Sequence, residues 1–271
     1  MKRGRLVLGL TLLLCFRAAP TYADDVAELL QSIVVDNFAD PEQRTWTENG
    51  NELKDTREWQ VRGSKFVTDQ YPQMAYVDTI PDALVANYPK AQLANADAAS
   101  KIPPSKSLGV YTKFDRKGYN YFELYPVKKD DKGNLVDAPY SLPGITKMID
   151  IWVLGSNFRT TLEMHVRDYR GIPYVLEFGS LDFQGWKNIR INVPAAIPQT
   201  KPYIPSYEGL LLTKIVVRTE PTERVDGFFT YFSQLKVLSD MHQNPFDGKA
   251  MTNPDFINKY FPTPTTQKAG K

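Results

Sequence analysis

Cysteine and histidine are scarce in this sequence. Its 271 residues include one cysteine, Cys15, and two histidines, His165 and His242. A single cysteine cannot form an intrachain disulfide, and so few nitrogen and sulfur ligands argue against a zinc-type catalytic centre. The sequence also lacks the Gly-x-Gly-x-x-Gly and Walker phosphate loops and the Gly-x-Ser-x-Gly pattern of hydrolases. We therefore expect no catalytic residues, no metal site and no cofactor.

The sequence also has no apolar run of the roughly 20 residues that a membrane-spanning helix requires. The short apolar run over residues 6–16 follows three basic residues and precedes a small-residue cleavage site. This pattern predicts a secretory signal peptide, residues 1–23, cut between Ala23 and Asp24. Cleavage would remove the only cysteine, and an exported protein without disulfides indicates a bacterial periplasm. We expect no membrane span.

A block of basic residues is missing as well. The full sequence has 33 basic and 31 acidic residues, and four of the basic ones lie in the predicted signal peptide. The mature chain would therefore be slightly acidic, with no cluster of Lys and Arg to contact a phosphate backbone. We expect no nucleic acid partner.

What the sequence does contain is alternation of apolar and polar residues, which is strongest over residues 145–193. A period of two is typical of β-strands with one buried face. Residues 161–168 and 172–179 predict a hairpin whose paired positions sum to 340. In that register the apolar side chains share one face, with Leu162 opposite Phe178, Met164 opposite Leu176 and Val166 opposite Tyr174. The other face would carry Glu163, His165, Arg167, Val175 and Glu177.

Further strands are predicted near residues 33–38, 59–62, 65–69, 74–78, 108–114, 119–125, 210–219 and 227–239. We expect residues 108–114 and 119–125 to form a hairpin, with a second hairpin around residues 128–133. Residues 81–100 predict a weakly helical surface insertion, and the proline-containing residues 240–271 predict an extended arm. These features favour an all-β fold: a jelly-roll-like antiparallel β-sandwich, formed as one domain by residues 24–239.

Two acidic residues in the predicted hairpin suggest a glycosidase as an alternative. Glu163 and Glu177 would face each other, and a retaining glycosidase needs two carboxyl groups about 5–5.5 Å apart. The alternative is a solvated face on which His165, Arg167 and Lys187 offset the two acids. We favour the solvated face, because no sugar-binding aromatic platform can be placed beside the pair.

Acidic loop residues suggest calcium as another alternative. The candidates are Asp36, Asp40, Asp130, Asp131 and Asn134. None of them follows the Asp-x-Asp-x-Asp-Gly spacing of a calcium loop. Turn formation by their side chains is therefore the favoured interpretation.

Aromatic residues are the remaining candidates for binding. The fifteen Tyr and four Trp suit stacking on sugars or packing against another protein, because each side chain combines a large apolar area with a polar tip. Trp152 lies on the opposite strand face from Ile151 and Val153. Either a second layer covers Trp152, which we favour, or its face is a binding surface. The candidate contacts to a partner or a glycan are Trp152, Trp186, Tyr119, Tyr121, His165, Glu163 and Glu177.

Five segments in chain order resemble those of a known family. They are Phe-Asp-Arg-Lys-Gly-Tyr-Asn at 114–120, Leu-Pro-Gly at 142–144, Ile-Asp-Ile-Trp-Val-Leu-Gly-Ser-Asn at 149–157, Val-Arg-Asp-Tyr-Arg-Gly at 166–171 and Leu-Asp-Phe-Gln-Gly-Trp-Lys at 181–187. Together they resemble the spirochaete flagellar filament outer-layer (sheath) proteins, the FlaA family. The resemblance extends from about residue 33 to residue 238.

The resemblance implies a galactose-binding-like jelly roll in the periplasm, on the periplasmic flagellum. It implies a structural, non-enzymatic role in the filament sheath, which would adjust filament stiffness and shape for motility. The implied partners are flagellin core subunits and other flagellar sheath proteins, with a core-attached glycan as a further candidate. The alternative is a secreted carbohydrate-binding module of jelly-roll type, which Trp152 and Trp186 exposed along one groove would favour.

Overall fold

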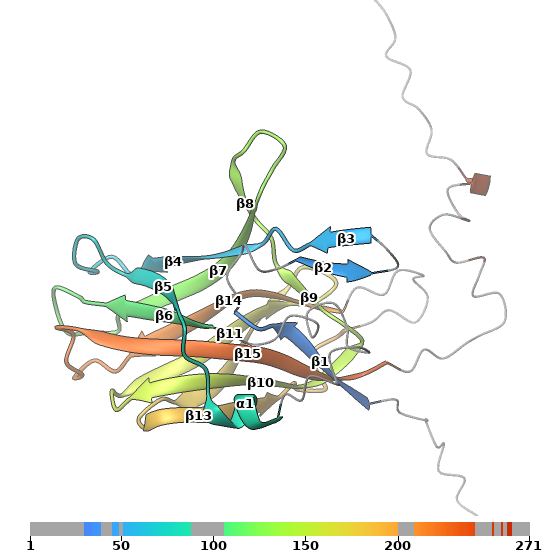
Figure 1. Cartoon of the computed structure of the whole chain (residues 1–271). Helices are drawn as coiled ribbons and strands as arrows, with labels where there is room; N and C mark the ends of the chain where they lie inside the picture. The colour runs from blue at the N-terminus through green and yellow to red at the C-terminus, as the bar shows by residue number, and fades with distance from the viewer. Residues whose placement is uncertain are drawn as a thin grey trace, which may run out of the picture.

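The computed structural model describes residues 30–38, 45–48, 51–87, 106–199 and 209–241, together with 251, 256 and 259–261. The predicted signal peptide with its cleavage site, and most of the predicted insertion and arm, lie outside these ranges. The described strands form two large antiparallel sheets and a separate hairpin of β2 (Thr45–Glu48) and β3 (Asn51–Lys54). The predicted all-β antiparallel sandwich is confirmed (Figure 1).

The first sheet has six strands in the order β13-β10-β15-β6-β5, with β1 also paired to β15. They are β1 (Leu30–Asp36), β5 (Gln73–Val77), β6 (Ser107–Thr112), β10 (Ile145–Ser156), β13 (Gln184–Asn192) and β15 (Phe228–Asp240). The second sheet has seven strands in the order β12-β11-β14-β7-β4, with β8 on β7 and β9 on β14. They are β4 (Glu58–Gly63), β7 (Tyr121–Lys129), β8 (Leu135–Asp137), β9 (Tyr140–Leu142), β11 (Thr160–Arg167), β12 (Pro173–Ser180) and β14 (Leu210–Thr219).

The core lies between the two sheets and contains the inward-facing side chains of both. On β10, the buried Ile149, Ile151 and Val153 alternate with side chains that point to the outer face. This alternation follows from the pleat of a strand, in which successive side chains point to opposite faces. The inner and outer faces of each sheet can therefore be read directly from the strand register.

The predicted hairpin of β11 and β12 is confirmed from Glu163 to Arg167, where the paired positions sum to 340. The predicted pairing of Leu162 with Phe178 is wrong. Leu162 lies opposite Gly179, because the register shifts by one residue between Leu162 and Glu163. Gly179 has a φ of +96°, which suits the irregular backbone of a β-bulge.

The predicted hairpin of residues 108–114 with 119–125 is wrong. Both strands exist, as β6 and β7, but β6 pairs with β5 and β15 in one sheet whereas β7 pairs with β4, β8 and β14 in the other. Residues 113–120 carry the chain across the sandwich instead of closing a hairpin. The side-chain amide of Asn120 donates to the Arg116 carbonyl at 2.7 Å, and the backbone N–H of Phe114 donates to the Val225 carbonyl at 2.9 Å. These contacts hold the connection in place.

Residues 65–69 were expected to be a strand, and this prediction is also wrong. They form turns with one isolated bridge, Val67 to Phe114. The second predicted hairpin is confirmed, because β8 pairs with the end of β7 across the turn at residues 130–134. The described start of the predicted insertion holds a short helix, α1 (Asp82–Asn87). Among the described residues, no helix is both long and apolar enough to cross a membrane.

Candidate functional site

The seven predicted contact residues do not meet in one site. Trp152 on β10 and Trp186 on β13 share the outer face of the six-stranded sheet, where both are half-buried. Four others lie on the outer face of the seven-stranded sheet: Tyr121, Glu163, His165 and Glu177. Tyr119 is strongly exposed in the connection between β6 and β7. The predicted set is therefore divided between the two opposite faces of the sandwich.

The outer face of the seven-stranded sheet is occupied by ion pairs. Arg218 donates from Nε and Nη2 to the Glu163 carboxylate at 2.8 and 3.2 Å, and its guanidinium lies 5.3 Å from the centre of the Tyr121 ring. His165 Nε2 lies 3.1 Å from the same carboxylate. The hydrogen bond from Arg218 lowers the pKa of Glu163, and the bond from His165 adds to this effect, against the opposing effect of burial.

A second cluster lies beside the first on the same face. Glu123 accepts hydrogen bonds from Lys214, at 2.6 Å, and from Arg62. Burial alone would raise the pKa of Glu123, but the two cationic donors outweigh it and the pKa lies below its ordinary value. Val216 sits between the clusters in the register, paired with Glu163 on one side and Glu123 on the other, and it is buried. The two clusters thus cover an apolar side chain.

This geometry does not favour glycoside hydrolysis. The predicted pairing of Glu163 with Glu177 is present in the register, but a glycosidase needs one carboxyl group with a raised pKa to act as the general acid. The pKa of Glu163 is shifted in the other direction, and Glu177 is exposed. The favoured interpretation of a charge-balanced face agrees with these contacts in part: His165 and Arg218 offset Glu163, whereas the predicted Lys187 lies on β13 of the other sheet.

The outer face of the six-stranded sheet has a different character. Two cross-strand rows can be followed through the register, and directly paired residues share a face. One row runs Ala75, Gly109, Tyr231, Leu154, Trp186, and the next runs Gln73, Tyr111, Phe229. Large apolar and aromatic side chains thus cover this end of the face, and the small Ala75 and Gly109 leave a depression near the β5 edge. Further along the same face, Asp150 lies 3.6 Å from Lys236 and accepts from Asn188 at 2.9 Å.

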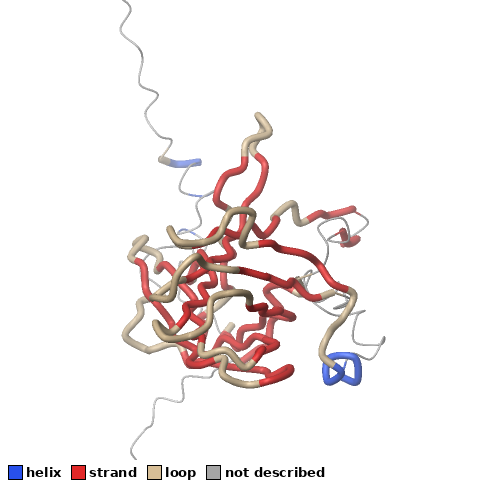
Figure 2. The backbone as a smooth tube through the Cα atoms, turned by 90° about the vertical axis from the view of Figure 1, so that its left-hand side faces the viewer, coloured by secondary structure: helices blue, strands red, loops and turns tan. Residues whose placement is uncertain are grey.

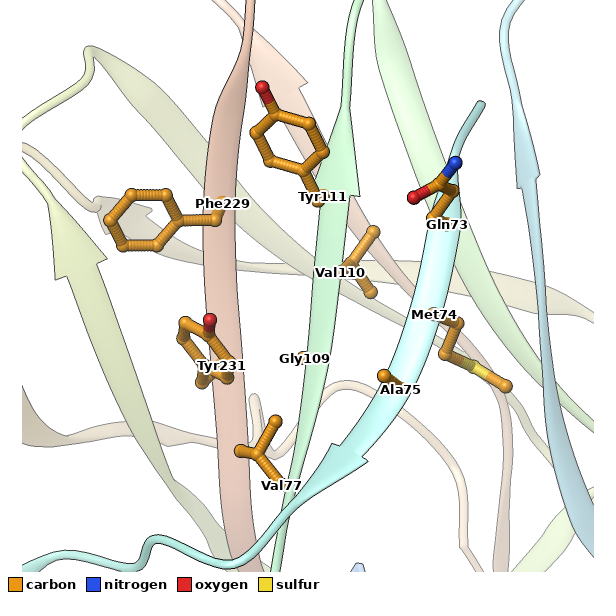
Figure 3. A pocket seen from close by; sticks show the side chains of 9 residues that line it. All are labelled: Gln73, Met74, Ala75, Val77, Gly109, Val110, Tyr111, Phe229 and Tyr231. Carbon is orange, nitrogen blue, oxygen red and sulfur yellow. The ribbon is translucent and has the colours of Figure 1, made fainter. Parts of the chain in front are cut away.

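A groove of about 270 Å³ lies at this depression, over β5, β6 and β15. We call it the aromatic groove; it is lined by Gln73, Met74, Ala75, Val77, Gly109, Val110, Tyr111, Phe229 and Tyr231 (Figure 3). None of these nine residues carries a charge. Tyr111 and Phe229 are 38% and 41% exposed. Trp152 and Trp186 lie elsewhere on the same face and do not line it.

Sequence reasoning missed the aromatic groove. A signal was present in residues 228–232, Phe-Phe-Thr-Tyr-Phe, where apolar residues occupy both faces of a strand. Phe228 and Phe232 point into the core, whereas Phe229 and Tyr231 point outward. A strand that is apolar on both faces indicates either burial on both sides or a binding surface.

Two of the acidic residues considered for calcium, Asp36 and Asp130, accept hydrogen bonds within the fold, whereas Asp40 lies outside the described residues. Asp130 accepts hydrogen bonds from the backbone N–H groups of Lys132 and Asn134 at 2.9 and 2.8 Å, as expected for a turn. Asp36 accepts from side chains of the core. Among the residues that the structure describes, no group of three or more His, Cys, Asp or Glu side chains could hold a metal ion.

Comparison with known families identifies the class of protein. The model of the flagellar filament outer layer protein family, FlaA, matches residues 30–246. This match covers most of the chain, so the chain belongs to the FlaA family, and the predicted resemblance is confirmed. A flagellar filament outer layer-like protein of Brachyspira hyodysenteriae (strain ATCC 49526 / WA1) is 30% identical over 135 residues. That match covers 50% of this chain and 58% of the relative.

Distant likenesses to solved structures were also found. A family 11 carbohydrate-binding module of Clostridium thermocellum has a TM-score of 0.37 and 9% identity, covering 79% of this chain and 98% of that one. The family 29 module CBM29_1 of Piromyces equi has a TM-score of 0.35 and 12% identity, covering 78% and 91%. The assignment of the fold rests on the strand pairing described above.

Proposed function

We propose that this FlaA-family protein is a structural subunit of the outer layer of periplasmic flagellar filaments. It would pack on the flagellin core, beside other sheath proteins, and adjust the stiffness and shape of the filament for motility. The observation that carries this proposal is the family match over residues 30–246, which includes every strand of both large sheets. The ion pairs that occupy the outer face of the seven-stranded sheet are consistent with a structural role.

The hairpin of β7 and β8 is the part of the described chain that best suits a contact with the filament. It projects beyond the body of the sandwich in both Figure 1 and Figure 2. All three residues of β8 are exposed, and Leu135 and Val136 are 52% and 37% exposed. Exposed apolar side chains on a protruding element favour a protein contact, because their burial against a partner is favourable.

The turn of this hairpin is held in one conformation before any partner binds. The Asp130 carboxylate accepts from the backbone N–H groups of Lys132 and Asn134. The backbone N–H of Gly133, which has a φ of +82°, donates to the Asp130 carbonyl at 2.9 Å. An ordered turn reduces the entropy lost on binding, so the hairpin is suited to act as a contact element.

Co-sedimentation tests the proposal. The chain from residue 24 onward is mixed with periplasmic flagellar filaments from which the outer layer has been stripped. Saturable pelleting with the filaments is the expected result, and cross-linking would then identify the contacting strands. Absence of pelleting, both alone and with other sheath proteins added, would contradict the proposal.

The alternative function, a secreted carbohydrate-binding module, predicts Trp152 and Trp186 exposed along one groove. They share a face, but both are half-buried and neither lines the aromatic groove. The two tryptophans therefore do not favour this alternative as the main function.

A further inference from the structure

The aromatic groove is maintained by an unusual choice of residue at its floor. A Cβ atom added to Gly109 would lie 2.5 Å from Cε1 of Tyr231, because the Tyr231 ring lies across the glycine. Glycine is unfavourable inside a strand and often marks a place where another group approaches closely. Here it lets a ring lie flat on the sheet, beside the exposed Ala75 of the neighbouring strand.

The groove combines flat apolar surfaces with uncharged hydrogen-bonding groups. Tyr111 and Tyr231 each present a ring with a hydroxyl at its tip. Phe229 adds a third ring, whose centre is 5.8 Å from that of Tyr231 and whose plane is inclined to it by 60°. The Gln73 side chain lies at the Tyr111 end of the groove (Figure 3). Aromatic faces with a few polar groups are the usual lining of small-molecule sites.

The charges around the groove narrow the class of ligand. None of the residues that line the groove is charged. Lys113 lies nearby but outside this lining, and its Nζ atom is directed at two rings, 5.2 Å from the centre of Tyr71 and 5.8 Å from that of Tyr111. A strongly charged ligand would lose its hydration here without gaining an ion pair in the groove. A ligand with C–H faces and many neutral hydroxyl groups would match both the rings and the polar groups.

We propose that the aromatic groove binds a neutral saccharide, with one pyranose ring stacked on Tyr231 and in contact with Phe229, and with its hydroxyl groups bonded to Gln73 and Tyr111. Its volume of about 270 Å³ is near the lower limit of ligand pockets, roughly 300 Å³, so the site takes one or two sugar rings and leaves the rest of a chain in solvent. This binding goes beyond the structural role in the filament and does not depend on it.

The test uses a blocked groove and a matched surface change. Ala75→Arg places a long side chain into the groove at an exposed position of the edge strand β5. Val175→Arg makes a comparable change on the edge strand β12 of the opposite sheet, where Val175 is 55% exposed. Both variants are compared with the unchanged chain by calorimetric titration with cellotetraose, β-1,4-galactotriose and mannotetraose at millimolar concentrations. Thermal melting of each variant checks that it folds.

The expected result is saturable binding of at least one oligosaccharide, weakened at least about tenfold by Ala75→Arg and unchanged by Val175→Arg. Phe229→Ala, which removes an exposed ring without filling the groove, should weaken binding by a similar factor. The proposal is overturned if none of the three oligosaccharides binds the unchanged chain. It is equally overturned if Ala75→Arg, correctly folded, binds as well as the unchanged chain.

A second arm identifies the source of the saccharide. Filament cores are used before and after enzymatic removal of any attached glycan. If Ala75→Arg pellets less than the unchanged chain with untreated cores only, the bound sugar is a glycan of the filament, and the proposal is supported. Loss of oligosaccharide binding without any effect on pelleting also supports the groove as a saccharide site and assigns it to a sugar that is not part of the filament.

Discussion

At the scale of single residues, Asp36 connects three parts of the fold. Its carboxylate accepts from Trp59 Nε1 at 2.8 Å, from the Tyr140 hydroxyl at 2.5 Å and from the Phe38 backbone N–H at 2.7 Å. The Trp59 ring stacks between Phe38 and Tyr140, with centroids 5.5 and 5.6 Å apart. Strands β1, β4 and β9, which are distant in sequence, are therefore joined through one buried carboxylate.

Removal of this carboxylate should be costly. Asp36→Ala leaves the indole N–H and the phenol hydroxyl buried without their acceptor, so we expect a loss of about 2–4 kcal/mol in the free energy of unfolding. Urea denaturation measures this loss in the free energy of unfolding. Asp137→Ala, on the exposed strand β8, is the control and should change stability by less than about 0.5 kcal/mol. Equal effects of the two variants would contradict this role of Asp36.

The paired carboxylate of Glu163 predicts how stability changes with pH. Folding lowers the pKa of Glu163, so the ionised carboxylate stabilises the folded state near neutral pH. This contribution to the free energy of unfolding is lost as the pH falls below about 5, because the unfolded chain then binds the proton more readily. Glu163→Gln should therefore lower the free energy of unfolding by about 1 kcal/mol near neutral pH. The difference should shrink towards about pH 3.

Glu177 supplies the matched control for this experiment. It lies opposite Glu163 in the register but is exposed, so Glu177→Gln should change the free energy of unfolding near neutral pH by less than about 0.5 kcal/mol. Urea denaturation at a series of pH values provides the comparison. If Glu163→Gln and the unchanged chain lose stability in parallel on acidification, the ion pair with Arg218 does not act as proposed.

At the scale of elements, the β7–β8 hairpin gives a prediction for filament binding. Leu135→Asp puts a charge at an exposed position, so the fold should be unaffected while the affinity for stripped filaments falls at least about tenfold, because a charge is costly to bury in an apolar contact. Co-sedimentation measures the affinity. Val175→Asp, at an equally exposed position on β12, should pellet normally. Normal pelleting of Leu135→Asp would exclude this hairpin as a contact.

The elements also show what the sequence can and cannot predict. Strands such as β10 and β14 follow from alternation, because one buried face leaves a period of two in the chain. The error at β6 and β7 has a different origin: alternation does not say which strand is the partner, and the connection of residues 113–120 crosses between sheets. The register shift at Leu162 could not be predicted from the alternation either, because it depends on the backbone conformation of Gly179.

At the scale of the whole molecule, the same limit applies to the candidate site. Glu163 and Glu177 could be paired from sequence because they belong to one local hairpin. The aromatic groove combines β5, β6 and β15, and β15 lies more than a hundred residues beyond β6. Only the sheet order brings Tyr111 beside Phe229. Sites built from distant strands therefore require the topology, and their residues cannot be grouped from sequence patterns alone.

The topology also predicts an asymmetry between the two ends of the chain. β1 pairs with β15, the last strand of the sandwich, and Phe38 just after it is fully buried. Asp240 still pairs with Leu30 and Ile145, and Met241 packs against the core. We propose that the predicted domain of residues 24–239 extends to residue 241 and that the residues beyond it form an arm. Deletion of residues 242–271 should then change the melting temperature by less than about 2 °C, because β15 ends at Asp240.

Deletion of residues 24–38 should have the opposite effect. It removes β1 together with Asp36 and Phe38, so the loss should exceed several kcal/mol and lower the melting temperature by more than about 10 °C, or prevent folding. Circular dichroism melts of the two deletions, each the control for the other, measure the difference. A C-terminal deletion that destabilises as much as the N-terminal one would show that the sandwich does not end at β15, and would contradict the proposed domain boundary.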